Sequence, residues 1–165
     1  MTSLLVRAAW VCPITGPPLA DGWVHVTDGR IAAVGHGHDA PAAARTHDLG
    51  SAVVLPGLVN AHTHLELSWL RGLVPPTGDF LTWVGRLMGR RTRLETADDR
   101  LAMDAMRAAL DELQTTGTAA VGDISNTLIS PPLLRDRGVP AVVFHELLGF
   151  RDADGRAAQP ASAVA

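Results

Sequence analysis

The chain of 165 residues contains one cysteine, Cys12, and no tyrosine. A single cysteine excludes an intrachain disulfide and a zinc site built from several cysteines, and it gives no sign of an oxidising compartment. We therefore predict a cytoplasmic protein. Aromatic residues make up only 4% of the chain, but many alanines, valines and leucines raise the apolar fraction to 47%. That fraction is sufficient to fill a hydrophobic core.

Long apolar runs and an excess of charge of one sign are also absent. No stretch approaches the roughly 20 apolar residues of a membrane helix, and the N-terminal apolar run is interrupted by Arg7 too early for a signal peptide. Lysine and arginine total 14 against 17 aspartates and glutamates, which leaves a net charge of −3. This balance gives no reason to expect nucleic acid or an anionic membrane as a partner.

The most informative segment that is present spans residues 55–66 and reads Leu-Pro-Gly-Leu-Val-Asn-Ala-His-Thr-His-Leu-Glu. In a strand, residues two apart point the same way, so His62 and His64 direct both imidazoles to one place while Thr63 faces the other side. Imidazole suits zinc and iron(II), and a catalytic metal site needs few protein ligands. The spacing favours a metal site over a pair of histidines that are merely hydrogen-bonded.

Short predicted strands separated by turn residues occupy the first part of the chain. The dipeptide Asp28-Gly29 between two β-compatible runs predicts a hairpin. His36, His38 and His47 lie in or near polar, Gly- and Ala-rich sequence, where we expect solvated side chains. Residues 1–54 are therefore predicted to form a small β domain, with strands at 4–11, 22–26, 31–34 and 46–49.

Strands and helices alternate after residue 55. A strand through the histidines is followed by helices at 79–88 and 97–115, a strand at 118–124, a helix at 131–137 and a strand at 139–146. Apolar strands that alternate with helices predict a parallel sheet, buried on both faces and joined by right-handed crossovers. We assign residues 55–150 to this α/β part. The tail at 151–165 has no periodicity and is predicted to be flexible.

The sequence predicts the ends of the helix at 97–115 and the faces of this helix and the one at 79–88. The helix at 97–115 should begin at a capping box formed by Thr96 and Asp99, and Gly117 should end it. The arginines of the helix at 79–88 and the segment after it are expected on a solvated face: Arg86, Arg90, Arg91 and Arg93. The longer helix should pack through one apolar stripe: Leu101, Ala105, Met106, Ala109, Leu110 and Leu113.

Polar residues stand where each predicted parallel strand ends, and in parallel barrels this edge carries the active site. Glu66 is predicted either to contact substrate or to orient a metal ligand, with an exposed loop carboxylate as the equal alternative. Asp123 is expected to cap the loop that follows it. Alternation lets only one of His145 and Glu146 face the interior, and that residue is predicted to contact substrate, with simple hydrogen bonding as the equal alternative.

The run Pro-Gly-Leu-Val-Asn-Ala-His-Thr-His at 56–64 resembles the end of the first barrel strand in the amidohydrolase superfamily. The continuation His64-Leu-Glu-Leu-Ser68 resembles the branch that deaminates heterocycles, which includes cytosine, adenosine-type and aminodeoxyfutalosine deaminases. The resemblance implies a (β/α)8 TIM barrel behind a composite β-sandwich domain. A complete barrel takes about 250 residues, so this chain should hold only its N-terminal part.

The resemblance also implies chemistry. In the family, one divalent zinc or iron(II) ion is held by the first-strand histidines, here His62 and His64, together with a histidine and an aspartate from later strands. The metal activates water, which attacks an electron-poor ring carbon or an amide carbonyl of a small-molecule substrate. The remaining ligands and the acid and base residues would lie beyond Ala165, so the catalytic residues themselves are not placed.

Three questions stay open at the sequence level. Adenosine-type members tend to carry a glutamate just before the tryptophan of the helix after the first loop, whereas Leu81-Thr82 precedes Trp83 here; this departure weakens a nucleoside substrate. Cyclic amidases, similar to dihydroorotases and hydantoinases, are the alternative reaction class. The chain could also be a catalytically incomplete fragment that needs further strands or a partner chain, and a homo-oligomer is possible.

Overall fold

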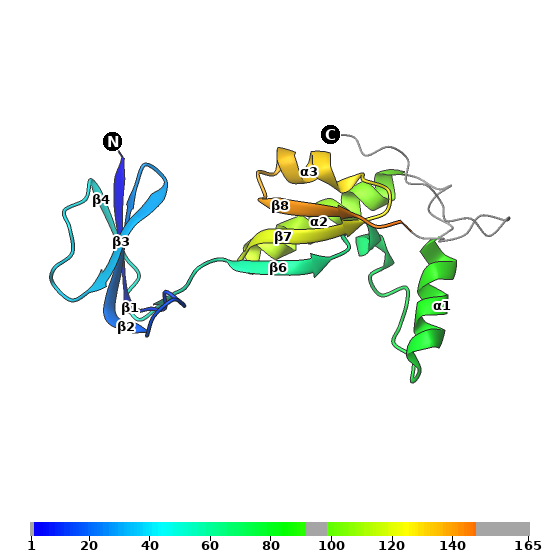
Figure 1. The fold of residues 1–165 in the computed structure, drawn as a ribbon, viewed down its shortest axis with the longest axis horizontal. Helices are drawn as coiled ribbons and strands as arrows, with labels where there is room; N and C mark the ends of the chain where they lie inside the picture. The colour runs from blue at the N-terminus through cyan, green and yellow to red at the C-terminus, as the bar shows by residue number, and fades with distance from the viewer. Residues whose placement is uncertain (1, 92–98, 148–165) are drawn as a thin grey trace. The chain divides into compact units, whose positions relative to one another are not determined.

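A computed structural model describes residues 2–91 and 99–147 of the chain (Figure 1). Its contacts divide the chain into two compact units, Met1–Pro56 and Gly57–Ala165, close to the boundary predicted at residue 54. Within the described residues, no helix is long and apolar enough to cross a membrane. The predicted tail at 151–165 lies outside the described residues.

The first unit is built on one five-stranded sheet. Its strands are β1 (Ser3–Val11), β2 (Leu19–Thr27), β3 (Arg30–His36), β4 (Arg45–Asp48) and β5 (Val53–Val54). They follow the order β3-β2-β1-β4, with β5 also paired to β1. The pairs β1–β2 and β2–β3 are antiparallel, and β4 and β5 run parallel to β1. The predicted β domain is thus confirmed as a sheet, but the described residues do not form the second layer of a sandwich.

The predicted hairpin is confirmed between β2 and β3. Asp28 and Gly29 both have positive φ, 49° and 77°, which is the two-residue turn whose twist matches that of paired strands. The Asp28 carboxylate also accepts a hydrogen bond from the Thr2 amide at 3.0 Å, which ties the turn to the start of the chain. His36, His38 and His47 are exposed, as expected.

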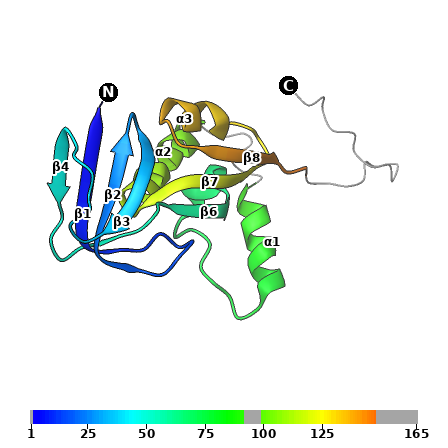
Figure 2. The same cartoon turned by 60° about the vertical axis from the view of Figure 1, so that its left-hand side comes forward.

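The second unit contains a three-stranded parallel sheet in the order β6-β7-β8 (Figure 2). Its strands are β6 (Leu58–Thr63), β7 (Thr118–Ser125) and β8 (Ala141–His145), and they are connected through the 3-10 helix η1 (Leu65–Leu70) and the helices α1 (Phe80–Arg91), α2 (Asp99–Thr115) and α3 (Ser130–Asp136). The predicted order of parallel strands and helices is confirmed, although η1 was not predicted.

One face of this sheet carries the core. Residues from η1, α2, β7, α3 and the turn before β8 form a single buried cluster: Leu65, Met106, Leu110, Val121, Leu133, Leu134 and Val139. The opposite face is exposed, with Val59 68%, Val142 60% and Phe144 51% accessible to solvent. The prediction of a sheet buried on both faces is therefore wrong for the described residues, because among them helices pack on one face only.

Most of the predicted stripe of α2 packs against the core, and the difference lies at its start, where Ala102 is buried in place of Leu101. Ala102, Met106 and Leu110 are buried, whereas Leu101 is 53% exposed. The fully buried residues of α2 are therefore four residues apart, and Leu101 lies beside this stripe. The predicted stop at Gly117 is confirmed, since this residue has a φ of 95° that favours glycine. The predicted capping box depends on Thr96, which lies outside the described residues.

Helix α1 begins after Asp79, whose carboxylate accepts a hydrogen bond from the Thr82 amide at 2.8 Å and so caps the first turn. The helix buries none of its residues, and Phe80 is 72% exposed. One of its arginines contradicts the predicted solvated face: the Arg91 side chain is 11% exposed and lies 3.7 Å from Glu66. Arg93 lies outside the described residues.

Candidate metal centre

The carboxyl end of β6 contains a bulge directly before the histidines. Asn60 pairs with Val121 and Thr63 pairs with Asp123, so β6 uses one residue more than β7 over this interval. The Asn60 side-chain oxygen accepts a hydrogen bond from the His62 amide at 3.2 Å, which stabilises the irregular turn. Bulges of this kind change the direction of the side chains that follow.

The bulge places both histidines on the exposed face of the sheet. Register partners in parallel strands point to the same side, so Thr63 shares the helix-covered face with Asp123. His62 and His64 therefore project from the opposite face, the one that also carries Val142 and Phe144. Without the extra residue, the pairing of Asn60 with Val121 would have turned His62 and His64 toward the helices.

The two imidazoles lie side by side. Their ring centroids are 5.2 Å apart, and the ring planes are inclined at 62°. His62 is exposed, and His64 is partly buried. Nδ1 of His64 is buried and accepts or donates no hydrogen bond within the described part of the chain, which is a costly state for a polar nitrogen that lacks a ligand. The pair can thus supply two nitrogen ligands, although the described residues contain no cluster of three metal-ligating side chains.

Glu66 is buried rather than exposed, with 4% of its surface accessible. One carboxylate oxygen accepts hydrogen bonds from the Ser125 hydroxyl at 2.9 Å, and from the Thr127 amide and hydroxyl at 3.0 and 2.6 Å. The other accepts one from the Asn126 amide at 2.8 Å. Burial raises the pKa of Glu66, but these hydrogen bonds outweigh burial and hold the pKa below its ordinary value.

Asp123 is fully buried and has a different role from the predicted loop cap. One of its oxygens accepts a hydrogen bond from the Leu65 amide at 2.8 Å, and the other accepts one from the Ser130 hydroxyl at 2.5 Å. Asp123 therefore joins the end of β7 to the residue that follows His64 and to the first residue of α3.

The end of β8 separates the two predicted substrate contacts. His145 pairs with Ser125, whose side chain lies on the helix-covered face. The Glu146 amide donates a hydrogen bond to the Ser125 carbonyl at 2.9 Å, so the ladder continues for one residue beyond β8. Alternation then assigns Glu146, and not His145, to the face of His62 and His64.

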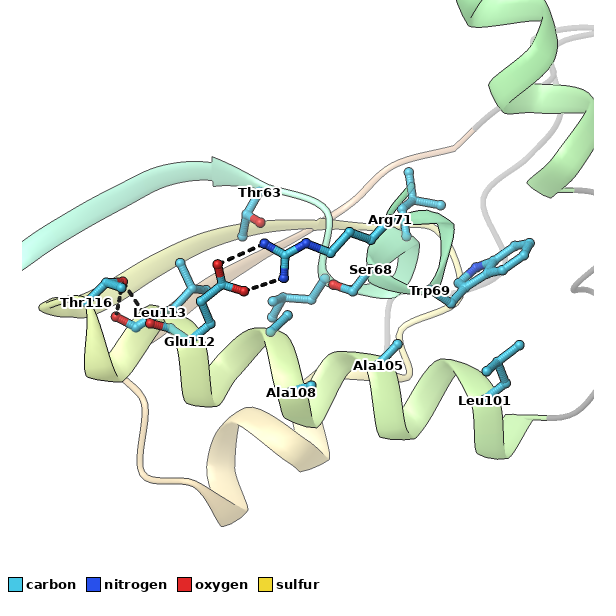
Figure 3. Close-up of a pocket in the computed structure, with 13 residues that line it drawn as sticks. Thr63, Ser68, Trp69, Arg71, Leu101, Ala105, Ala108, Glu112, Leu113 and Thr116 are labelled. Atoms are coloured by element: carbon cyan, nitrogen blue, oxygen red, sulfur yellow. Dashed lines mark hydrogen bonds and ion pairs between the residues drawn. The ribbon is translucent and has the colours of Figure 1, made fainter. Parts of the chain in front are cut away.

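A cavity of about 590 Å³ lies apart from this site. Figure 3 shows it between η1 and α2, crossed by the bidentate pair of Arg71 and Glu112. Thr63 lines the cavity, and Thr63 points away from the histidines. The cavity and the face that carries His62 and His64 therefore lie on opposite sides of the sheet.

Residues 53–143, more than half of the chain, match the family model described as the Amidohydrolase family. The chain belongs to the amidohydrolase family. Among curated relatives, a 5-methylthioadenosine/S-adenosylhomocysteine deaminase of Nitratidesulfovibrio vulgaris (strain DSM 19637 / Miyazaki F) is 35% identical over 134 residues. This match covers 73% of the chain and 28% of the relative, so the amidohydrolase described here spans less than a third of that protein.

Solved structures agree with the family assignment. The aminofutalosine deaminase of Helicobacter pylori, in complex with methylthio-coformycin, matches with a TM-score of 0.72 and 29% identity, covering 88% of this chain and 35% of the other. An adenosine deaminase from Xanthomonas campestris with bound zinc matches with a TM-score of 0.69 and 28% identity, covering 86% and 33%. The described residues of the second unit form three parallel strands with helices on one face, and they do not form a complete barrel.

Proposed function

We propose that this amidohydrolase is a metal-dependent aminohydrolase that removes an amino group from a nitrogen heterocycle, with His62 and His64 as two ligands of one divalent zinc or iron(II) ion. The observation that carries the proposal is the geometry of the pair. Both imidazoles project from the same face at a centroid separation of 5.2 Å, and the buried Nδ1 of His64 has no hydrogen-bond partner among residues 2–91 and 99–147.

The residues present fit such an ion. Neutral imidazole is a good ligand for zinc and iron(II), and the histidines stand at the carboxyl end of the first parallel strand, where barrel enzymes hold their active sites. When bound, a divalent metal lowers the pKa of water so that hydroxide is available near neutral pH. His62 is exposed, so solvent and substrate can reach this end of the sheet.

The chain's own residues have distinct roles in this proposal. His62 and His64 hold the ion at the edge of the open face, and the paired Thr63 between them keeps the strand in register. Glu146 is proposed as a substrate contact because it follows β8, two strands from β6, on the same face of the sheet. Glu66 fits a substrate contact poorly, since the chain itself supplies four hydrogen bonds to its carboxylate.

The relatives support deamination over the opening of a cyclic amide. The three proteins compared above are named as deaminases, of 5-methylthioadenosine and S-adenosylhomocysteine, of aminofutalosine and of adenosine. We therefore propose a 6-aminopurine nucleoside or a related amino-heterocycle as the substrate class. The residues Leu81-Thr82 before Trp83 remain the sequence feature that argues against tight recognition of ribose.

The proposal is tested by ammonia release from the zinc-loaded full-length protein. The substrates are 5-methylthioadenosine, S-adenosylhomocysteine and aminodeoxyfutalosine, with dihydroorotate and hydantoin as cyclic-amide controls. We expect ammonia from at least one amino-heterocycle and no opening of the cyclic amides. His62→Ala and His64→Ala should abolish both bound metal and activity, whereas Asp104→Asn, on the exposed side of α2, should alter neither. Turnover by a metal-free protein would refute the proposal.

The remaining predictions are tested by simpler measurements. A protein that lacks part of its barrel should aggregate or associate through the open edges of its sheet. Light scattering on a chain of residues 1–165 therefore separates an incomplete fragment from an independent enzyme, which would be monomeric, cooperative in unfolding and active. A homo-oligomer and a cytoplasmic location stay predictions.

A further inference from the structure

Two fully or almost fully buried carboxylates, Asp123 and Glu66, link the segment after His64 to the end of β7. Their accessible fractions are 0% and 4%. A buried carboxylate is tolerated only where hydrogen bonds or cations compensate its lost hydration. Both residues therefore need an explanation that is independent of substrate.

The links are reciprocal. Asp123 belongs to β7 and accepts a hydrogen bond from the Leu65 amide of η1. Glu66 belongs to η1 and accepts hydrogen bonds from residues 125–127, at the end of β7 and just after it. Each of the two segments thus sends one carboxylate to the backbone of the other.

His64 lies between two residues that are both tied to Asp123. Thr63, the residue before it, is the register partner of Asp123, and Leu65, the residue after it, donates its amide to the Asp123 side chain. The His64 carbonyl accepts the Leu67 amide at 3.0 Å, which fixes the start of η1. The backbone is consequently held on both sides of His64, at a place where a strand would otherwise pass into a free loop.

We propose that Glu66 and Asp123 are positioning residues that hold the His64 imidazole at the distance and angle from His62 that a shared metal ion requires. The inference rests on the proposed metal site. Ligands must be held to within about 0.5 Å of the productive geometry, and the loss of groups that orient ligands typically lowers metal affinity by 10- to 100-fold. The reciprocal hydrogen bonds of Glu66 and Asp123, which we call the clamp, act through the backbone on both sides of His64.

The hydrogen bonds predict different results for two conservative variants. In Glu66→Gln, one carboxylate oxygen becomes an NH2 group, and in either orientation that group faces a backbone N–H, of Asn126 or of Thr127. In Asp123→Asn, the amide oxygen can still accept the Leu65 N–H, and the NH2 group can donate to the hydroxyl of Ser130, which is free to rotate. Glu66→Gln should therefore break the clamp, and Asp123→Asn should preserve it.

The test measures zinc affinity of the full-length protein by competition with a chromophoric chelator, together with the visible absorption spectrum of the cobalt(II)-loaded protein. We expect Glu66→Gln and Asp123→Ala to bind zinc about 10- to 100-fold more weakly and to change the cobalt spectrum. Asp123→Asn should stay within about twofold of the parent protein. Val139→Ala is the matched control, since it removes buried core volume but none of the hydrogen bonds of Glu66 or Asp123, and it should lower stability without changing either metal readout.

The outcomes separate this inference from the proposed function. A parent protein that binds no divalent metal overturns both. A parent protein that binds zinc while Glu66→Gln binds it equally well, with the same cobalt spectrum, overturns the clamp alone. If Asp123→Ala fails to fold, the comparison of Glu66→Gln with Val139→Ala decides. Equal loss of zinc affinity in those two variants would show that general stability, and not the clamp, controls the site.

Discussion

Gly122 of β7 is the residue whose substitution tests the bulge beneath the histidines most sharply. A Cβ atom at this position would lie 2.4 Å from the Ala61 carbonyl oxygen and 2.9 Å from its carbonyl carbon. Both are backbone atoms of the bulge in β6, so no flexible side chain can move aside. Gly122 is therefore needed for close approach of the two strands and not for an unusual backbone angle.

The size of the effect follows from these distances. A carbon–oxygen contact relaxes at about 3.3 Å, so Gly122→Ala requires β6 and β7 to separate by about 0.9 Å at the bulge. Overpacking of this kind typically costs about 1–3 kcal/mol. The shift also exceeds the tolerance of about 0.5 Å for a preorganised site. We expect zinc affinity to fall by about 10- to 100-fold, by analogy with other losses of ligand orientation.

The assay combines urea unfolding of the metal-free protein, followed by far-UV circular dichroism, with the zinc competition measurement. Gly85→Ala in α1 is the control, because its added Cβ would meet no atom within 4 Å and alanine is favoured over glycine inside a helix by about 0.5–1 kcal/mol. That variant should be slightly stabilised and should bind zinc normally. A Gly122→Ala protein with unchanged stability and unchanged zinc affinity would refute the close approach of Gly122 to Ala61.

Further variants probe the fold around the site. Leu110→Ala should destabilise the protein by about 2–5 kcal/mol because Leu110 is fully buried between α2 and the sheet. Leu101→Ala, at a half-exposed position of the same helix, should lower the free energy of unfolding much less in the same urea titration. Equal losses in the two variants would contradict the observed stripe. Asp79→Ala should fray α1, as measured by helical circular dichroism. Hydrogen bonds from Thr82 lower the pKa of Asp79 below 3.8. The stabilisation of α1 by this carboxylate is therefore complete at neutral pH and is lost as pH falls through the folded-state pKa. Acid titration of the parent should show a loss of helix that Asp79→Ala lacks. Gly29→Ala should destabilise the hairpin by about 1 kcal/mol because alanine is strained at a φ of 77°, and the amide exchange of β3 should report it.

The order of the elements could be predicted from the sequence because it depends on local patterns. The dipeptide Asp28-Gly29 specifies its turn through backbone angles that few other residues adopt. Gly117 specifies the end of α2 in the same way. The spacing of His62 and His64 likewise indicated a metal site from two residues alone, although it could not reveal that an extra residue in β6 determines the face on which they stand.

The parts that escaped prediction depend on residues far apart in the chain. Glu66 and Asp123 contact segments 58 to 61 residues away, and no local pattern identifies such partners. Leu101 was misplaced because apolar residues flank the true stripe of α2 on both sides. Arg91 was expected in solvent because its sequence neighbours are charged, yet its position at the end of α1 brings it near Glu66.

The most direct test of the account is a crystal structure of the zinc-loaded full-length protein with data collected at the zinc absorption edge. The account predicts an anomalous peak about 2.0–2.1 Å from one ring nitrogen of His62 and one of His64, on the open face of the β6-β7-β8 sheet. A peak bound elsewhere, with both imidazoles hydrogen-bonded to protein groups, would contradict it.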